Sequence, residues 1–204
     1  MQNNIKESWK HDTALLKREF DNHRITGIKP EFTNERCKEA FLHGIATIKH
    51  DGSCCAIIGG QLYKRYDAKK GKPVPKGAIK CQDEPDPITG HLPCWVRCDL
   101  ESPADKWFYA ARQKFIEMNG LDLLIDHTYE AIGKHFQGNP YNLEYDVLIL
   151  HAISRVDVER TFEGVKKYLS ENYDEGLVFW YNGEPVCKIK RSDFGLEWNG
   201  KKNK

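Results

Sequence analysis

The sequence contains no long apolar run. Nowhere do about eighteen apolar residues follow one another, the length that a membrane-spanning helix requires, and the N-terminal stretch MQNNIKESWKHD has no apolar core of the kind found in signal peptides. Internal repeats and low-complexity tracts are absent as well. We therefore expect a monomer of the cytoplasm or nucleus, with no membrane partner and one main domain among its 204 residues.

A strong net charge is also missing, because the formal charge is only +1. The charge is nevertheless uneven: residues 64–80 hold seven Lys or Arg against one Asp, and the last seventeen residues are basic too. Such a basic strip is typical of a protein with a phosphate-bearing partner. A solvated loop and tail would explain it equally well.

The seven cysteines are an odd number, and they occur without a secretory signal. This combination favours reduced thiols over a disulfide framework. His91, Cys94 and Cys98, with Cys81 nearby, raise the question of a zinc site. Their spacings, H-x-x-C and C-x-x-x-C, differ from the paired C-x-x-C of structural zinc sites, so zinc is disfavoured.

Local patterns in the first half of the chain change from helical to extended. Apolar residues at helix-like spacings over residues 7–20 predict an amphipathic helix, and residues 1–40 are expected to form an N-terminal helical extension. Residues 45–66 contain three β-rich runs separated by Asp-Gly and Gly-Gly, which predicts an antiparallel meander. The proline-rich residues 67–100 are expected to form a long irregular insertion.

A second helix is expected after the insertion. Ser102 suits the N-cap, Pro103 the first helical position and Asp105 a capping box, while Gly120 suits the end of the helix. An apolar stripe through WFYAARQKFIEM supports this prediction.

The remaining sequence predicts strands, one more helix and a hairpin. HTYEAIG and LEYDVLILHAI are strand-like, and a helix capped by Asp157 is expected after them. Asn182 and Gly183 join GLVFWY to EPVCKIK as a hairpin turn. This order of elements predicts an α+β fold of antiparallel sheets with packed helices. The main domain is expected over residues 41–198, followed by a basic tail over 199–204.

One lysine stands at the end of a predicted strand. The segment IATIKHDGSCC places Lys49 before a turn that Asp51 and Gly52 shape. Lys-x-Asp-Gly alone is weak, because it occurs by chance in roughly one chain in twenty of this length, and an ordinary strand end explains it. We expect one of Cys54 and Cys55, which follow it, to pack under the site as a small apolar residue.

Several other charged or aromatic residues follow this lysine in a fixed order of short motifs. They are Arg65, Glu130 in YEAIG, Tyr145 in YDVLIL, Glu175 in DEGLVFW, and Lys188 and Lys190 in VCKIKRSDFGLEW. The ordered set resembles the nucleotidyltransferase motifs of ATP-dependent ligases and mRNA capping enzymes, in which a lysine takes up a nucleoside monophosphate.

Within that superfamily, the sequence most resembles the ATP-dependent 5′-to-3′ RNA ligase family of vertebrates and some viruses. The resemblance covers most of residues 45–198 and includes CQDEPDPITGHLPCW, an insertion that general ligases and capping enzymes do not share. It implies an ATP-grasp-like nucleotidyltransferase fold of antiparallel β-sheets flanked by helices. It also implies ATP and Mg²⁺ (or Mn²⁺) as cofactors, and RNA with 5′-phosphate and 3′-hydroxyl ends as the partner.

The resemblance further implies that Lys49 attacks the α-phosphate of ATP and becomes lysyl-AMP. A free lysine, with a pKa of about 10.4, is charged at neutral pH, so neighbouring cations must favour its neutral form before it can attack. The alternation in KIK points Lys188 and Lys190 to the same strand face, from which both can reach the phosphate. Without the family resemblance, an exposed strand face explains this pair.

Other residues take binding roles by the same resemblance. Glu175 would bind Mg²⁺, Glu130 would accept from a ribose hydroxyl, Arg65 would contact the nucleotide or the RNA phosphate, and Tyr145 would stack on adenine. Three of them have a plainer interpretation from sequence alone. Glu175 suits a solvated turn, Glu130 an exposed strand position, and Tyr145 the core.

Substrate choice is the least constrained part of this interpretation. Only six residues follow Trp198, so we expect no room for the OB-fold of DNA ligases and capping enzymes. RNA would then be held by this domain, its insertion or the N-terminal segment, with residues 64–80 and the C-terminal lysines on RNA phosphates. One alternative is a capping-type guanylyltransferase, and another is a catalytically inactive nucleotide- or RNA-binding relative.

Overall fold

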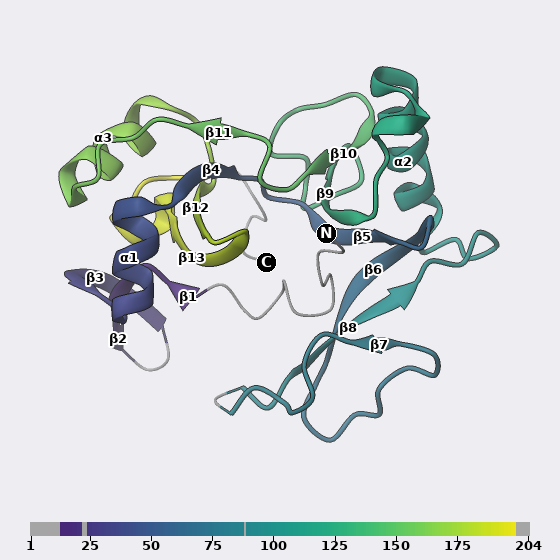
Figure 1. Ribbon diagram of the computed structural model, residues 1–204, viewed down its shortest axis with the longest axis horizontal. Coiled ribbons are helices and arrows are strands. Elements are labelled where there is room, and N and C mark those ends of the chain that lie inside the picture. Colours follow the sequence, from purple (N-terminus) through teal and green to yellow (C-terminus); the bar gives the residue numbers. More distant parts are fainter. Residues whose placement is uncertain (1–12, 22–23, 88, 199–204) are drawn as a thin grey trace. The chain divides into compact units, whose positions relative to one another are not determined.

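The computed structural model describes residues 13–21, 24–87 and 89–198. The chain divides into two compact units (Figure 1). The first unit contains Asp51–His151, and the second contains the described residues up to His50 together with those from Ala152 onward. The chain passes between the units at His50–Asp51, directly after the motif lysine, and again at His151–Ala152.

A five-stranded sheet forms the second unit. All of its neighbouring strands run antiparallel except the short β1, which pairs in parallel with β13. The strand order is β1 (Thr13–Ala14), β13 (Glu184–Lys190), β12 (Gly176–Tyr181), β4 (Ile45–Lys49) and β11 (Arg155–Val156). β12 is therefore the central strand. Its neighbours are β4, which ends at Lys49, and β13, which ends at Lys190.

One face of this sheet carries the core of the second unit. Ala46, Leu177, Phe179 and Ile189 are almost fully buried there. The helices α1 (Glu35–His43) and α3 (Phe162–Glu171) contribute to the same cluster, beside the hairpin β2 (Leu16–Asp21) and β3 (Arg24–Phe32) (Figure 1). The 3₁₀ turn η2 (Arg191–Phe194) follows β13. Since side chains alternate along a strand, the neighbours of the core residues point to the opposite face.

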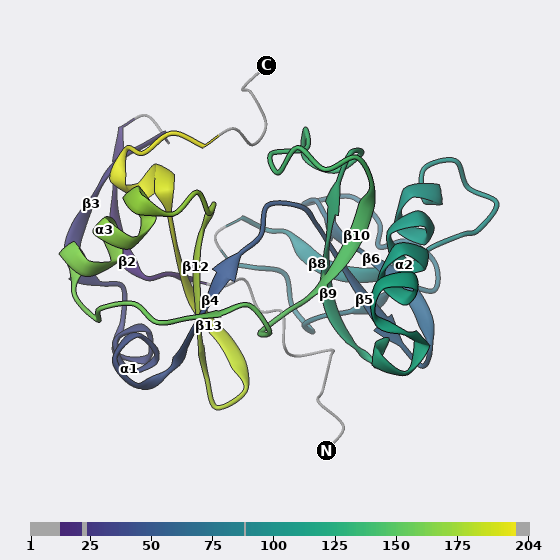
Figure 2. The same cartoon turned by 90° about the horizontal axis from the view of Figure 1, so that it is seen from above.

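The first unit is built on a six-stranded sheet that is antiparallel throughout. Its order is β10 (Asp146–Leu150), β9 (His127–Gly133), β5 (Ser53–Ile58), β6 (Gln61–Ala68), β8 (Leu92–Arg97) and β7 (Ile79–Lys80). The helix α2 (Lys106–Asn119) lies alongside β9 and β10 (Figure 2) and is followed by the 3₁₀ turn η1 (Leu121–Leu123). Ala111 and Phe115 of α2 pack on Tyr129 and Ala131 of β9.

The expected α+β class with antiparallel sheets is confirmed. Helices and strands are mixed along the chain, and almost all strand pairs are antiparallel. Among the described residues, no helix is both long and apolar enough to span a membrane.

The helix predicted over residues 7–20 is wrong where the structure describes it. Residues 13–21 form β1 and β2, and the first helix of the described chain begins at Glu35. The described part of residues 1–40 is therefore mainly extended, with helix only from Glu35 onward, and residues 1–12 and 22–23 lie outside the described residues. β1 pairs with β13, and the Leu15 amide donates to the Lys188 carbonyl at 2.7 Å. This pairing with a strand far along the sequence outweighs the local helical spacing.

The predicted meander over residues 45–66 is only partly right. β5 and β6 form an antiparallel hairpin, but β4 pairs with β12 and β11 of the other sheet. The Asp-Gly segment is therefore a crossing between two sheets rather than a hairpin turn. Residues 67–100 are also less irregular than expected, because β8 pairs along β6 and β7 pairs with β8.

Both predicted helix N-caps are wrong, whereas the predicted hairpin is confirmed. α2 begins after Asp105, whose carboxylate makes no capping hydrogen bond to the helix. It accepts instead from the Lys64 ammonium group and from the Asp99 amide. α3 is capped by Thr161 rather than by Asp157.

As predicted, α2 ends at Gly120. Asn182 and Gly183 have φ of 52° and 80°, as the turn between β12 and β13 requires.

The cap of α3 gives a direct test of this correction. The Thr161 hydroxyl accepts from the Gly164 amide at 2.9 Å, so Thr161→Ala should lower the free energy of unfolding by about 1 kcal/mol. The exposed Asp157 does not cap the helix, and Asp157→Ala should change that energy by less than about 0.5 kcal/mol. Urea unfolding of both variants measures the difference. If Asp157→Ala lowered the free energy of unfolding more than Thr161→Ala, Asp157 would be the cap, as the sequence predicted.

Candidate functional site

Strand register places two lysines on either side of one glycine. Gly176, the first residue of the central strand β12, pairs with Lys49 of β4 on one side and with Lys190 of β13 on the other. A β-carbon on Gly176 would lie 2.1 Å from the Ile189 carbonyl oxygen, so a side chain there would push the strands apart. The two lysines are remote in sequence and become neighbours only through this pairing.

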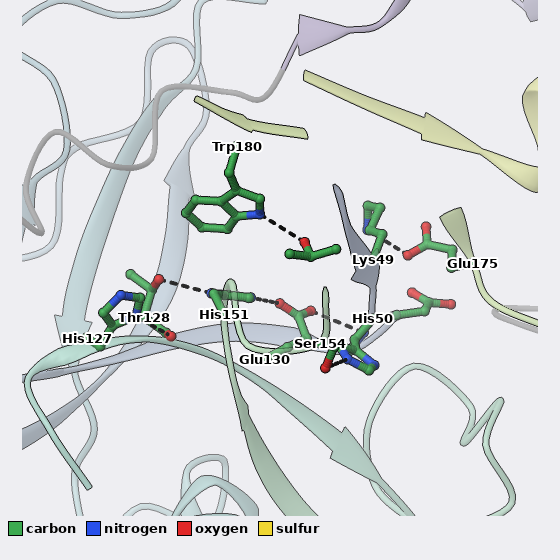
Figure 3. A network of polar contacts seen from close by, with 12 residues as sticks. Lys49, His50, His127, Thr128, Glu130, His151, Ser154, Glu175 and Trp180 are labelled. Carbon is green, nitrogen blue, oxygen red and sulfur yellow. Dashed lines mark hydrogen bonds and ion pairs between the residues drawn. The ribbon is translucent and has the colours of Figure 1, made fainter. Parts of the chain in front are cut away.

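Glu175, directly before Gly176, holds both lysines. Its carboxylate accepts from Lys49 Nζ through Oε2 at 2.6 Å (Figure 3). It also accepts from Lys190 Nζ through Oε1 at 2.6 Å. Glu175 is only 5% exposed. Burying a carboxylate is costly unless it is paired, and here each oxygen has a cation. The carboxylate is thereby fixed between the two ammonium groups.

The lysines lie on the sheet face opposite the helices. Lys49 alternates with the half-buried Ile48, which lies on the same face as the buried Ala46, and Lys190 and Lys188 alternate with the buried Ile189. Lys188 pairs with Val178, two positions along the register from Gly176, and is half-buried. This face therefore concentrates positive charge, which favours an anionic ligand such as a phosphate group.

Contacts around β4 keep its last residues in place. Trp180 Nε1 donates to Thr47 Oγ1 at 2.9 Å, and the Ile48 amide donates to the Ser154 carbonyl at 2.9 Å. The ring of His50 contacts the Ser154 hydroxyl at 3.2 Å (Figure 3). Lys49 thus extends from a strand that is hydrogen-bonded on both edges, which limits the positions its ammonium group can take.

A second polar group lies within the first unit around Glu130 of β9. One carboxylate oxygen accepts from the Gly52 amide at 3.1 Å, and the other lies 3.2 Å from His151 Nε2. The other ring nitrogen of His151 contacts the Thr128 hydroxyl at 3.0 Å (Figure 3). Glu130 is 9% exposed. Both of its oxygens have partners, and each retains a lone pair for a further donor.

The Asp-Gly segment is held by its backbone. The Asp51 amide donates to the Tyr141 hydroxyl at 2.6 Å, while the Gly52 amide is bound by Glu130. A β-carbon at Gly52 would lie 2.3 Å from the Ala131 carbonyl oxygen, so only glycine allows this close approach to β9. Gly52 is therefore required by packing within the first unit. Asp51 contributes its amide here.

Arg65 and Glu130 act on the same thiol. Burial raises the pKa of Cys54 well above its usual value, the Glu130 charge raises that pKa further, and the Arg65 charge lowers it. Cys54 pairs with Glu130 across β5 and β9. The Arg65 Nε donates to Asp67 Oδ1 at 3.0 Å. Cys54 and the fully buried Cys55 are thus protonated packing residues, as the sequence suggested for one of them, and Cys54 lies close to two charged candidates.

Tyr145 stays outside these groups of contacts. It immediately precedes β10 and is 41% exposed. Its ring lies beneath Lys114 of α2, whose Nζ is 5.1 Å from the ring centroid. The described contacts do not bring Tyr145 to Glu130, so its role as an adenine-stacking residue stays a prediction.

The cysteines considered for zinc point into separate apolar clusters. Cys81 packs with Trp95, Cys94 with Leu92, and Cys98 belongs to the cluster beneath α2. Burial raises the pKa of Cys81 to about 11 and that of Cys98 to about 12, so both thiols are protonated at neutral pH. Within the described ranges, no three His, Cys, Asp or Glu side chains are grouped to hold a metal ion.

Comparison with known proteins shows a distant similarity. The chain is 25% identical to a rat (Rattus norvegicus) protein named RNA ligase 1, in an alignment of 255 residues that covers 89% of this chain and 76% of that protein. The similarity points to an RNA ligase family. No model of a known protein family matches the chain.

Sequence reasoning missed the residues that support Glu130 and the Asp-Gly segment. His151 and Thr128 extend the Glu130 contacts, and Tyr141 accepts the Asp51 amide. His151 ends the run YDVLILH, and Thr128 stands two residues before Glu130 on β9. Alternation along β9 would have placed Thr128 on the Glu130 face. The sequence has no local signal that joins Tyr141 to Asp51.

The shared carboxylate predicts a stability effect. Glu175→Gln removes the charge that pairs with two partly buried lysines and leaves their ammonium groups without compensation, so the free energy of unfolding should fall by about 1–3 kcal/mol. Glu171→Gln, on the exposed end of α3, is the matched control and should change that energy by less than about 0.5 kcal/mol. Urea unfolding at pH 7 compares them. Equal stabilities would contradict the paired arrangement of Glu175.

Proposed function

We propose that the chain is an ATP-dependent RNA ligase in which Lys49 is the residue that takes up AMP. The observation that carries this proposal is the strand register that places Lys49 and Lys190 on opposite sides of Gly176 with Glu175 between them. The distant similarity to a protein named RNA ligase 1 supports the same reaction class. The order of the sequence motifs supports it as well.

In the proposed first step, Lys49 Nζ attacks the α-phosphate of ATP. A nitrogen–phosphorus bond forms, the bond to the β-phosphate's bridging oxygen breaks, and pyrophosphate leaves. The ammonium group must lose its proton before or during the attack. In the structure this group is paired with Glu175, which favours the charged form, so the ion pair must be exchanged when ATP binds. The same carboxylate is a candidate acceptor for the proton.

Cationic side chains would stabilise the negative charge of the transition state. Lys188 and Lys190 share the face on which Lys49 ends, where they suit the α-phosphate oxygens. Mg²⁺ or Mn²⁺ fits Glu175 because such ions commonly bind one or two carboxylates together with substrate phosphates. The bound ion would neutralise charge on the triphosphate. Without the ion, the ammonium groups of Lys49 and Lys190 balance the negative charge of Glu175.

Glu130, Arg65 and Tyr145 would take the nucleoside-binding roles that the family resemblance implies. Glu130 would accept from a ribose hydroxyl through the lone pairs that Gly52 and His151 leave available. Arg65 would contact the nucleotide or an RNA phosphate, and Tyr145 would stack on adenine. Asp51 and Gly52 would hold the segment that follows the nucleophile. We propose on these grounds that residues 41–198 adopt an ATP-grasp-like nucleotidyltransferase fold.

The remaining steps transfer AMP and seal the RNA. The 5′-phosphate of RNA attacks the lysyl-AMP phosphorus and releases Lys49, which leaves a 5′–5′ pyrophosphate bond between AMP and the RNA. A 3′-hydroxyl then attacks the RNA phosphate, loses its proton and displaces AMP. A phosphodiester bond replaces the pyrophosphate bond, so the steps balance with ATP converted to AMP and pyrophosphate.

Part of the basic strip suits RNA phosphates. Lys64 and Arg65 are engaged in ion pairs with Asp105 and Asp67, and they lie within β6. The strip's other lysines are all exposed: Lys69, Lys70, Lys72, Lys76 and Lys80. These five are the stronger candidates for RNA contacts, because exposed ammonium groups can approach a backbone without first breaking buried pairs.

Covalent labelling tests the nucleophile. The protein is incubated with Mg²⁺ and ATP or GTP labelled at the α-phosphate, then denatured and separated from free nucleotide. Wild-type protein should keep label from ATP. Lys49→Arg should keep none, because arginine can retain the ion pair with Glu175 but is not a nucleophile at neutral pH.

A matched control separates this result from general damage. Lys167→Ala, at an exposed position on α3, should label like the wild type. Label from GTP instead of ATP would indicate a capping-type guanylyltransferase. Absence of label from both nucleotides in folded wild-type protein would indicate a nucleotide- or RNA-binding relative without this activity. Full labelling of Lys49→Arg would rule out Lys49 as the acceptor.

Charge reversal tests the strip. Changing Lys69, Lys70 and Lys72 to Glu should weaken binding of single-stranded RNA and reduce its salt dependence, with the slope of log affinity against log salt falling by about 0.7 for each lost phosphate contact. Reversal of Lys166 and Lys167 on α3 is the control. Fluorescence anisotropy from about 50 to 200 mM salt measures both. Unchanged affinity and slope in the strip variant would remove this assignment.

A further inference from the structure

The N-terminal strands contact β13 close to both of its candidate lysines. β1 pairs with β13 in parallel, and the Leu15 amide donates to the Lys188 carbonyl at 2.7 Å. The hairpin of β2 and β3 packs against η2, the turn that directly follows Lys190 (Figure 2). The N-terminal strands therefore reach the strand that carries both lysines, although the sequence motifs begin only at residue 45.

One buried carboxylate joins the hairpin to Lys190. Asp193 of η2 accepts from the Lys190 amide through Oδ2 at 2.8 Å. Arg18 of β2 donates to the same carboxylate from Nε at 3.1 Å and from Nη2 at 3.3 Å. The side chain of Asp193 is only 5% exposed, so its charge needs a partner, and the guanidinium group supplies one at two points. Arg18 thus holds the carboxylate that in turn holds the Lys190 backbone.

The turn η2 is anchored on its other side by Arg191. The Arg191 amide donates to the Glu175 carbonyl at 2.9 Å. Its buried guanidinium group donates to the Asn172 carbonyl at 2.7 Å and also to the Leu169 carbonyl. These contacts join η2 to the end of α3 and to the residue that binds both lysines. The backbone on either side of Lys190 is therefore fixed from two directions.

We propose that Arg18 and Asp193 are positioning residues that keep Lys190 directed at the reacting phosphate. The inference rests on the proposed function, in which Lys190 stabilises the negative charge on the α-phosphate. When ATP binds and the ion pairs of Glu175 are exchanged, the placement of the Lys190 ammonium group depends on its backbone anchor. A cation stabilises a transition state best when it is in place beforehand, and a displacement of about 1 Å can cost about a hundredfold in rate.

A second ion pair on the same strand provides a matched control. Arg36 of α1 pairs with Glu184, the first residue of β13, and both side chains are more than half exposed. This pair also joins an arginine to β13, but it lies at the opposite end of the strand from Lys190. Arg36→Gln therefore removes an arginine pair from β13 without affecting the anchor of Lys190.

Single-turnover labelling of the full chain with α-labelled ATP tests the proposal. Arg18→Gln should lower the rate constant at saturating ATP by about tenfold or more, but should change the half-saturating ATP concentration by less than about threefold. This split is expected because Lys190 acts on charge that develops in the transition state. Arg18→Lys keeps a cation beside Asp193 and should react within about threefold of the wild type. Arg36→Gln should react like the wild type.

Amide hydrogen exchange, followed by NMR without nucleotide, gives a readout that does not depend on activity. In Arg18→Gln the Lys190 amide should exchange about tenfold faster than in the wild type, because its acceptor is no longer held, while the amides of β12 keep their wild-type rates. Asp193→Asn breaks the same pair from the other side. It should show the same kinetic split, and it decides the matter if Arg18→Gln does not fold.

The outcomes separate this inference from the proposed function. Wild-type protein that takes no label would refute the ligase proposal and the catalytic role of Lys190 with it, and the exchange rates would still show whether Arg18 holds the Lys190 backbone. Labelled wild type with an unchanged rate constant in folded Arg18→Gln, or an equal loss in Arg36→Gln, would overturn the positioning role alone. Unchanged exchange at Lys190 would overturn it as well.

Discussion

One buried carboxylate shared by two lysines is the constraint on which the candidate site depends. Glu175 stands at the start of the central strand, and the strands on either side end at Lys49 and Lys190. Gly176 allows the strands to approach because it has no side chain. The apolar face beneath α1 and α3 fixes the register, since slipping by one residue would expose the core residues and turn the lysines inward. Stability and candidate chemistry are therefore set by the same pairing.

The polar group of the first unit follows a similar principle. Glu130 projects from a strand whose alternate residues, Tyr129 and Ala131, are fully buried beneath α2. Its carboxylate is used to hold the Gly52 amide, and His151 is engaged on the other side. The second unit has an apolar sheet face covered by α1 and α3, the first has one packed against α2, and in both the charged candidates lie on the opposite face. In both cases, backbone alternation produces the separation between packing and chemistry.

Much of the local structure was predictable because it depends on short-range physics. The strand HTYEAIG, the Asn-Gly hairpin and the end of α2 at Gly120 all form as expected. The helix caps were not predictable in this way. The Asp105 carboxylate is bound by the Lys64 ammonium group and the Asp99 amide, and Thr161 stands closer to the start of α3 than Asp157 does. The segment around Leu15 resembled a helix by spacing, but pairing with β13 makes it a strand. Contacts between distant segments outweighed local preference in each case.

The sequence by itself determined which residues carry chemistry and the order in which they occur, because side-chain type and strand alternation are local properties. Lys188 and Lys190 share a face for that reason alone. Only the tertiary structure decided that β4 leaves β5 and joins β12, and that Glu175 lies between two lysines. The pairing that brings Lys49 to Glu175 joins segments more than a hundred residues apart, and its register is set by the burial of a whole sheet face rather than by any short motif.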